Sequence, residues 1–202
     1  LRFINPHYFA AGATLYGSEA MGMYQYEGKE YAGLNEHSGT NQCSDCHQTH
    51  ALTVDPNVCA ECHEEVESAE DFVNVRYNFA DYDGDGDDAE GLALEEETML
   101  EALYAGIQAY AADTAGAAIL YDGHSYPYFF ADLNANGELD ADEANGGNSY
   151  KNWTPRLLRA AYNFQWAQKD PGSFVHNGIY VIQALYDSLE DIGVDVSAMS
   201  RP

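Results

Sequence analysis

The pattern Cys-x-x-Cys-His occurs twice within a short stretch, and the two copies contain all four cysteines of the 202-residue chain. The copies are Cys43-Ser44-Asp45-Cys46-His47 and Cys59-Ala60-Glu61-Cys62-His63. This spacing is typical of c-type haem attachment, because two thiols on one helical turn can each form a thioether with a haem vinyl group. The histidine that follows can then ligate the iron. We therefore predict two covalently attached haem c groups.

Three other uses of four cysteines compete with haem attachment. A zinc ribbon also contains paired Cys-x-x-Cys motifs at a similar separation. A dithiol redox pair needs one such motif, and a disulfide framework needs only an even number of cysteines. None of these explains a histidine directly after both pairs, so haem attachment is favoured.

Two six-coordinate haems need two more axial ligands, because neither His47 nor His63 can reach the far side of its own haem. His50 follows His47 too closely to cap the first haem, so we assign it to the second. His37 lies just before the first motif and is assigned to the first haem, with His7 as the third candidate. The histidines and methionines expected to pack or cap are His124, His176, Met21 and Met23.

Haems with histidine on both faces pass electrons and do not bind substrate. The short gap between the motifs keeps the two haems close, so that electrons can hop between them. We therefore predict an electron-transfer protein, not an enzyme. A haem enzyme that reduces small oxyanions would need one open iron site, and it is the alternative. A calcium-dependent structural module that carries the haems passively is a third interpretation.

A complete EF-hand calcium loop follows the aromatic stretch YPYFF. Its ligand positions 1, 3, 5, 7, 9 and 12 are Asp132, Asn134, Asn136, Glu138, Asp140 and Glu143. Gly137 falls at position 6, where the loop turns sharply. The flanking residues do not predict two long helices, so we expect a structural calcium site and not a sensor that opens. A solvated acidic turn without an ion is the alternative.

A second acidic cluster departs from the EF-hand register. Its candidate ligands are Asp81, Asp83, Asp85, Asp87, Glu90 and Glu95. Position 12 is Leu92, so the bidentate acid must be displaced to Glu90 or Glu95. So many carboxylates would repel one another without a cation, and a disordered acidic loop is the alternative. We predict one or two Ca²⁺ ions for the whole chain.

Acidic residues far outnumber basic ones, with 34 Asp and Glu against 8 Lys and Arg and a formal net charge of −26. Such a surface repels nucleic acid and anionic membranes, and it suits cations or a partner with a basic face. No apolar run approaches the roughly 20 residues that cross a bilayer, so we predict no transmembrane segment. The chain begins at Leu1 without Met, as expected of a processed or truncated product.

Three helices are predicted in the second half of the chain from apolar residues at helical spacing. The first covers residues 96–112. The second begins after the N-cap Thr154, with Pro155 at its first position, and runs to about Gln168. The third is capped by Asp170-Pro171 and ends at Gly193.

These elements predict a mainly α fold with much irregular structure. Residues 1–75 would form a dihaem cytochrome c segment wrapped around its cofactors. Residues 76–202 would form a small helical, calcium-binding segment packed on it. Because c-type haems are attached outside the cytoplasm, we expect an exported protein that is extracellular, periplasmic or at the cell surface.

Several phrases of the sequence resemble the C-terminal region of large multihaem c-type cytochromes of extracellular electron transfer. They are NPHYFAAGATLYGSEAMG, KEYAGLNEH, the haem-motif stretch, DYDGDGDDAEG, SYPYFFADLNANGELDADE, NWTPRLLRAAYNFQ, KDPGSFVHN and YVIQALYDS. The resemblance covers nearly the whole chain. It implies electron transfer to redox partner proteins or through other copies of the same chain.

Members of this group usually carry further haem motifs upstream, and this sequence has none before Cys43. The resemblance therefore implies that His7, in Pro-His-Tyr, ligates a haem outside the segment. In that case His7 would act on a neighbouring subunit, and the chain would polymerise into a filament with a continuous row of haems.

Overall fold

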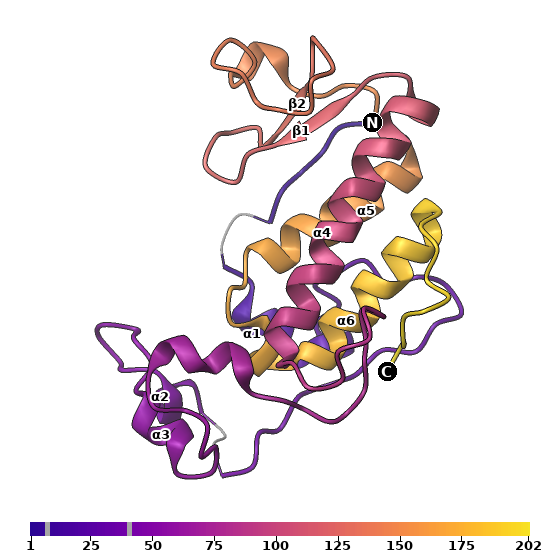
Figure 1. Cartoon of the computed structure of the whole chain (residues 1–202). Helices are drawn as coiled ribbons and strands as arrows, with labels where there is room; N and C mark the ends of the chain where they lie inside the picture. Colours follow the sequence, from indigo (N-terminus) through magenta and orange to yellow (C-terminus); the bar gives the residue numbers. More distant parts are fainter. Residues whose placement is uncertain (7–8, 40–41) are drawn as a thin grey trace.

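The computed structural model describes residues 1–6, 9–39 and 42–202 (Figure 1). Its helices are α1 (Ala11–Tyr16), α2 (Cys43–Cys46), α3 (Pro56–Ala60), α4 (Leu92–Tyr110), α5 (Pro155–Gln168) and α6 (Ser173–Ile192). Short 3-10 turns cover Gly17–Glu19, Ala69–Asn74 and Gly146–Asn148, and a π-turn covers Ala111–Ala115. Strands β1 (Ile119–Tyr121) and β2 (Phe129–Ala131) pair antiparallel, with Leu120 opposite Phe130. None of these helices is long and apolar enough to cross a membrane.

The three long helices pack against one another and form the hydrophobic core. Leu103 and Ile107 of α4, Leu157 of α5 and Leu185 of α6 are fully buried there. Burying each such side chain stabilises the fold by about 1.5–3 kcal/mol. Figure 1 shows the β1–β2 hairpin at one end of this bundle and α2 and α3 in a lobe near the other end.

The ends of α5 and α6 are placed by local signals that the sequence carries. The Thr154 side chain accepts a hydrogen bond from the backbone N–H of Leu157 at 3.2 Å, and Pro155 occupies the first turn. Gly193 ends α6 with φ of 95°, a conformation that favours glycine. The predicted start of the second helix and the predicted end of the third are therefore confirmed.

Two helix starts differ from the prediction. α4 begins at Leu92, earlier than residue 96, because the extended Gly91 passes close to the Val73 backbone and turns the chain into the helix. α6 begins at Ser173 after Gly172, and Asp170 does not cap it. The Asp170 side chain instead contacts His176 within the helix.

Residues 10–35 lie against α5 and α6, although residues 1–75 were expected to wrap around haem together. Thr14 accepts a hydrogen bond from the Trp166 indole at 3.3 Å, and the Met23 backbone donates to the Tyr180 hydroxyl at 3.1 Å. Met23 is buried, as predicted for a packing residue, whereas Met21 is 65% exposed. The 3-10 turn Ala69–Asn74 packs against α4, so the chain contacts the helical core both before and after α2 and α3.

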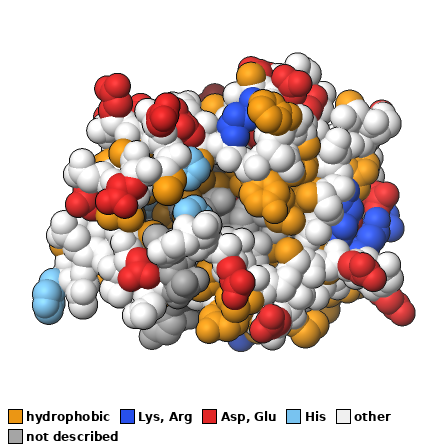
Figure 2. Space-filling model, turned by 90° about the horizontal axis from the view of Figure 1, so that it is seen from below, with side chains coloured by type: hydrophobic (Ala, Val, Ile, Leu, Met, Phe, Trp, Pro, Cys, Tyr) orange, Lys and Arg blue, Asp and Glu red, His pale blue; other side chains and the backbone are white. Residues whose placement is uncertain are grey.

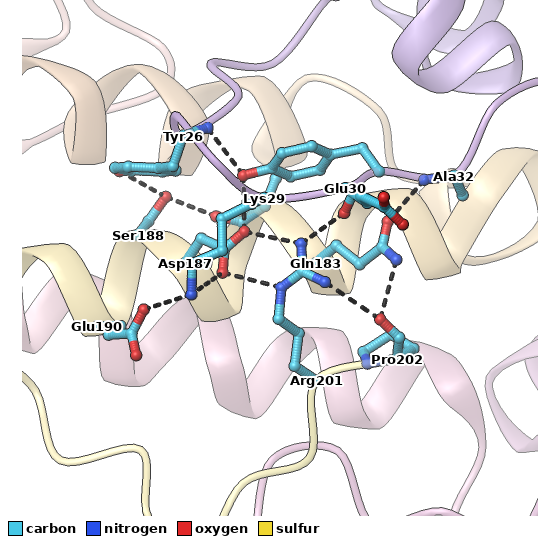
Figure 3. A network of polar contacts seen from close by, with 12 residues as sticks. Tyr26, Lys29, Glu30, Ala32, Gln183, Asp187, Ser188, Glu190, Arg201 and Pro202 are labelled. Carbon is cyan, nitrogen blue, oxygen red and sulfur yellow. Dashed lines mark hydrogen bonds and ion pairs between the residues drawn. The ribbon is translucent and has the colours of Figure 1, made fainter.

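A polar network fixes residues 26–32 and the C-terminal residues to the side of α6 (Figure 3). The buried Asp187 carboxylate accepts hydrogen bonds from the Tyr31 hydroxyl at 2.6 Å and from the Arg201 guanidinium at 2.9 Å. Gln183 joins the same two segments, since it accepts from the Ala32 N–H and donates to the Pro202 carbonyl. Burial and the Asp187 contact raise the pKa of Tyr31. The network holds the segment that leads toward His37.

Helix α6 is interrupted at Asn177, where φ is −171° and ψ is 69°. The interruption is anchored by the first part of the chain. Asn177 donates to the Gly33 carbonyl at 2.8 Å, and Asn35 donates to the carbonyls of Val175 and His176 at 3.2 and 2.9 Å. The position of His176 is therefore set by contacts between α6 and residues 33–35.

Candidate haem and calcium sites

Both Cys-x-x-Cys-His motifs lie on short helical turns in the lobe that contains α2 and α3 (Figure 1). The backbone N–H groups of His47 and His63 each donate to the carbonyl of the first cysteine of their motif at 2.8 Å. All four thiols are free and at least partly exposed. Burial, together with the nearby Cys46 thiol, raises the pKa of the Cys59 thiol. The two motifs therefore adopt the same turn and lie close to each other.

The imidazole of His47 faces the imidazole of His176, with ring centroids 6.2 Å apart and planes inclined by 36°. A metal between two imidazoles, with metal–nitrogen bonds of about 2 Å, separates the ring centroids by about 6 Å. The Nδ1 atom of His47 lies 3.0 Å from the Leu52 carbonyl. The Nδ1 atom of His176 lies 2.8 Å from an Asp170 carboxylate oxygen. Each ring thus has Nε2 left for a metal, as in metal-ligating histidines.

The histidine of the second Cys-x-x-Cys-His motif, His63, forms an equivalent pair. The His63 ring faces the His37 ring, with centroids 6.2 Å apart and planes inclined by 44°. The Nδ1 atom of His63 lies 3.4 Å from a Glu65 carboxylate oxygen. The spacing fits a second iron held between two histidines.

The pairs differ from the assignment made from the sequence. His37 lies opposite His63 and not opposite His47, and His176 takes the place expected for a distal ligand. His50 and His124 are both exposed. His7 lies outside the described residues. His176, which the sequence analysis assigned to packing or capping, comes to face His47 through the α6 interruption and the Asn35 contacts, which are tertiary features.

The surface around the histidines is hollowed. Figure 2 shows histidine side chains beside a recess on the face seen from below, with Asp and Glu side chains around it. Within residues 42–75, Val66 is the only buried side chain. The lobe therefore has almost no core of its own side chains.

The loop 132–143 begins directly after β2, and its first and last acidic residues accept backbone hydrogen bonds from within the loop. Asp132 accepts from the Gly137 N–H at 2.9 Å, and Glu143 accepts from the N–H groups of Leu133 and Asp140 at 2.7 and 3.1 Å. Asp132 and Glu143 are buried, and Asp140 accepts from two asparagine amides of the loop. The side chains of Asp132 and Glu143 are therefore turned toward the loop interior.

The acidic segment 81–95 reproduces part of this arrangement with a longer loop. Asp81 accepts from the N–H groups of Gly84 and Gly86, and Glu95 accepts from the N–H groups of Tyr82 and Asp83. Glu95 therefore contacts the second residue of its loop, as Glu143 contacts Leu133.

Carboxylates of this segment converge in two overlapping groups. One oxygen from each of Asp81, Asp83 and Glu95 lies within 4.8 Å of the others, and the same holds for Asp83, Asp85 and Glu90. Burial and the charges of Asp83 and Asp85 raise the pKa of Glu90 to about 7. Burial also raises the pKa of Asp83 and of Glu95. Asp87 is exposed and belongs to neither group.

The haem motifs and the facing histidines point to cytochromes, and comparison with known proteins agrees. The C-type polyheme cytochrome OmcC of Geobacter sulfurreducens is 29% identical over 95% of this chain, and OmcB from two strains of the same species is 28% identical over the same share. This chain is homologous to polyhaem c-type cytochromes. The resemblance inferred from the sequence is thereby confirmed. The chain spans only 26–27% of the length of these relatives.

The other comparisons add no further relatives. No family model matches the chain, and no solved structure matches it. The arrangement of the haem ligands therefore has to be argued from the geometry of this chain alone.

Proposed function

We propose that this chain is an electron-transfer module with two covalently bound haem c groups, each held between two histidines. The observation that carries the proposal is the pair of imidazole separations, both 6.2 Å, between a motif histidine and a histidine elsewhere in the chain. Two facing rings at the spacing of a shared metal, each next to a haem-attachment motif, fit the cofactor in both places.

The residues divide into two sets. Cys43, Cys46, His47 and His176 would hold the first haem, and Cys59, Cys62, His63 and His37 would hold the second. When bound, haem supplies a one-electron iron couple whose potential is tuned by its axial ligands and their hydrogen bonds. The Asp170 carboxylate oxygen lies 2.8 Å from Nδ1 of His176, so Nε2 would be the atom that ligates the iron of the first haem. The Nδ1 atom of His47 contacts the neutral Leu52 carbonyl, so Nε2 would be the ligand atom of this histidine too.

Electron transfer is favoured over the alternative of an oxyanion reductase. Histidine on both faces of each iron leaves no open position for substrate. The net charge of −26 also repels small anions. The homology to polyhaem cytochromes supports the same choice.

The distal ligands can be tested by single substitutions in the haem-loaded chain. We expect His176→Ala to convert one haem to a five-coordinate state that binds carbon monoxide rapidly, while the other haem stays low-spin. His37→Ala should do the same to the other haem, and His176→Met should raise one potential. The matched control is His50→Ala, which removes an exposed histidine near the first motif and should change neither haem. Carbon monoxide binding in His50→Ala, or none in His176→Ala, would overturn the assignment.

We also propose that the protein is exported and exchanges electrons with redox partners that present a basic face. We further propose that the chain self-associates into a filament, in which His7 ligates a haem of a neighbouring copy. Light scattering and electron microscopy of the haem-loaded chain test it. Self-association would be ruled out if the particles have the mass of a single haem-loaded chain at every protein concentration.

Loop 132–143 is proposed to bind one Ca²⁺ as a structural ion. The inward Asp132 and Glu143 carboxylates support this proposal, since they are the first and last ligands of an EF-hand loop. Glu143→Gln should abolish this site in a calcium titration. An unchanged titration would rule it out.

A further inference from the structure

A second cation site can be argued from the acidic segment 81–95, which electron transfer does not require. Its carboxylates do not form ion pairs with any basic side chain in the described part of the chain. Asp83 and Glu95 are nevertheless 5% and 3% exposed. Unpaired buried carboxylates destabilise a fold unless a cation or hydrogen bonds compensate for their charge.

Hydrogen bonds do not satisfy all of these oxygens. The Oδ2 atom of Asp83 and the Oε1 atom of Glu90 are buried and have no hydrogen-bond partner. Both residues belong to the converging groups, and Asp83 is common to the two. The Asp83 carboxylate therefore keeps one buried oxygen without a partner, although the Asp85 N–H and the Thr98 hydroxyl contribute hydrogen bonds to this side chain.

The dimensions of the cluster match calcium. Oxygens bound to one Ca²⁺ lie about 2.3–2.6 Å from it, so two of them can be at most about 5 Å apart. The oxygens of each group lie within 4.8 Å of one another. A Mg²⁺ ion would demand a smaller, near-octahedral set and would retain several waters. Asp83 and the four carboxylates that share its two groups suit the larger ion, which takes six to eight oxygens.

We propose that the segment 81–95 binds one Ca²⁺ next to Asp83, separately from the EF-hand loop. Its ligands are drawn from the two groups that share Asp83, with Asp81 and Glu95 in one group and Asp85 and Glu90 in the other. Glu95, on the first turn of α4, replaces the acidic ligand that ends an EF-hand loop. Glu90 adds a ligand at a position where the 12-residue EF-hand loop has none.

The site joins three parts of the molecule. Residues 75–91 connect the lobe that contains α2 and α3 to helix α4. The Leu92 N–H donates to the Val75 carbonyl at 3.0 Å. Gly84, with φ of 81°, lies so close to the Ala198 backbone that a Cβ atom would collide with it. The Ser200 N–H donates to the Tyr82 carbonyl at 3.1 Å. Calcium would thus hold the haem lobe, α4 and the C-terminal residues together.

Calcium titration calorimetry of the haem-loaded, chelator-treated chain tests the proposal. The Glu143→Gln background removes the loop 132–143 site, and we expect it to retain one Ca²⁺ per chain. In that background the exposed Asp85→Asn should weaken binding about tenfold or more, because affinity depends on ligand charge. Asp88→Asn is the matched control, since it removes the same charge from the same loop outside the cluster. It should change affinity by about twofold at most.

Hydrogen exchange gives a second readout. Calcium should slow exchange of residues 75–91 and 194–202 in the Glu143→Gln chain. The proposal is overturned if that chain binds no calcium, if Asp85→Asn and Asp88→Asn weaken binding equally, or if exchange of these residues is unaffected. Low-spin haem spectra recorded in parallel separate this result from failure of the haem assignment.

Discussion

In residues 42–75, Val66 is the only side chain that the structure buries, whereas α6 alone buries Tyr180, Ile182, Leu185 and Leu189. The two regions therefore obtain their stability from different sources. The helical part has an apolar core of its own amino acids. The lobe has two haem-attachment motifs, two facing histidine pairs and almost no core, so the proposed haems would act as its core. Substitutions in one region should therefore affect the stability of that region more than the stability of the other.

The largest effect should come from preventing haem attachment. Replacing all four motif cysteines by alanine should leave residues 42–75 nearly unprotected from hydrogen exchange, because so little of this segment is buried. Helices α4 to α6 should retain most of their protection. Hydrogen exchange with mass spectrometry resolves the two regions. A lobe that stays protected without haem would show that its own side chains are sufficient.

Truncation of a buried side chain in the helical core should lower the unfolding free energy of the helical part. Leu185→Ala removes a fully buried side chain and should destabilise the fold by about 2–5 kcal/mol. Val175→Ala, at a 42% exposed position of the same helix, is the control and should cost less than about 1 kcal/mol. Chemical denaturation followed by far-UV circular dichroism measures both. Equal losses would contradict the assignment of the core to α4–α6.

The Asp187 network should contribute somewhat less. Asp187→Asn removes the buried negative charge with which Arg201 and Lys29 pair, and we expect a loss of about 2–3 kcal/mol. Glu190→Gln removes a half-exposed carboxylate that also pairs with Lys29, and it should cost less than about 1 kcal/mol. The unfolding free energies of both variants decide the point. If the two variants lose the same amount of unfolding free energy, the burial of Asp187 has no energetic importance.

The smallest predicted effect concerns the N-cap of α5. Thr154→Ala removes the side-chain oxygen that accepts from the Leu157 N–H and should cost about 1 kcal/mol. Thr154→Ser keeps the acceptor and should recover most of this loss. Neither substitution should alter the haem spectrum. A spectral change would show that the two regions are more tightly coupled than their separate cores imply.

The same contrast explains how much the sequence could predict. The Thr154-Pro155 and Gly193 signals are local, so the start of α5 and the end of α6 were found correctly. The haem motifs and the spacing of loop 132–143 are also local. The three-residue strands β1 and β2 were not predicted, because elements this short carry too little periodicity.

Long-range features account for the remaining differences. His176 faces His47 only because α6 is interrupted at Asn177 and Asn35 holds the flanking carbonyls. The choice of Glu95 in the second acidic loop likewise depends on where α4 begins. Neither relation can be derived from spacing along the chain, since both depend on how segments far apart in sequence pack together.

A crystal structure of the haem-loaded chain would test the central claim most directly. We predict that the iron attached through Cys43 and Cys46 is ligated by His47 and His176. The iron attached through Cys59 and Cys62 should be ligated by His63 and His37. Either iron capped instead by His50, by a methionine or by water would contradict this account.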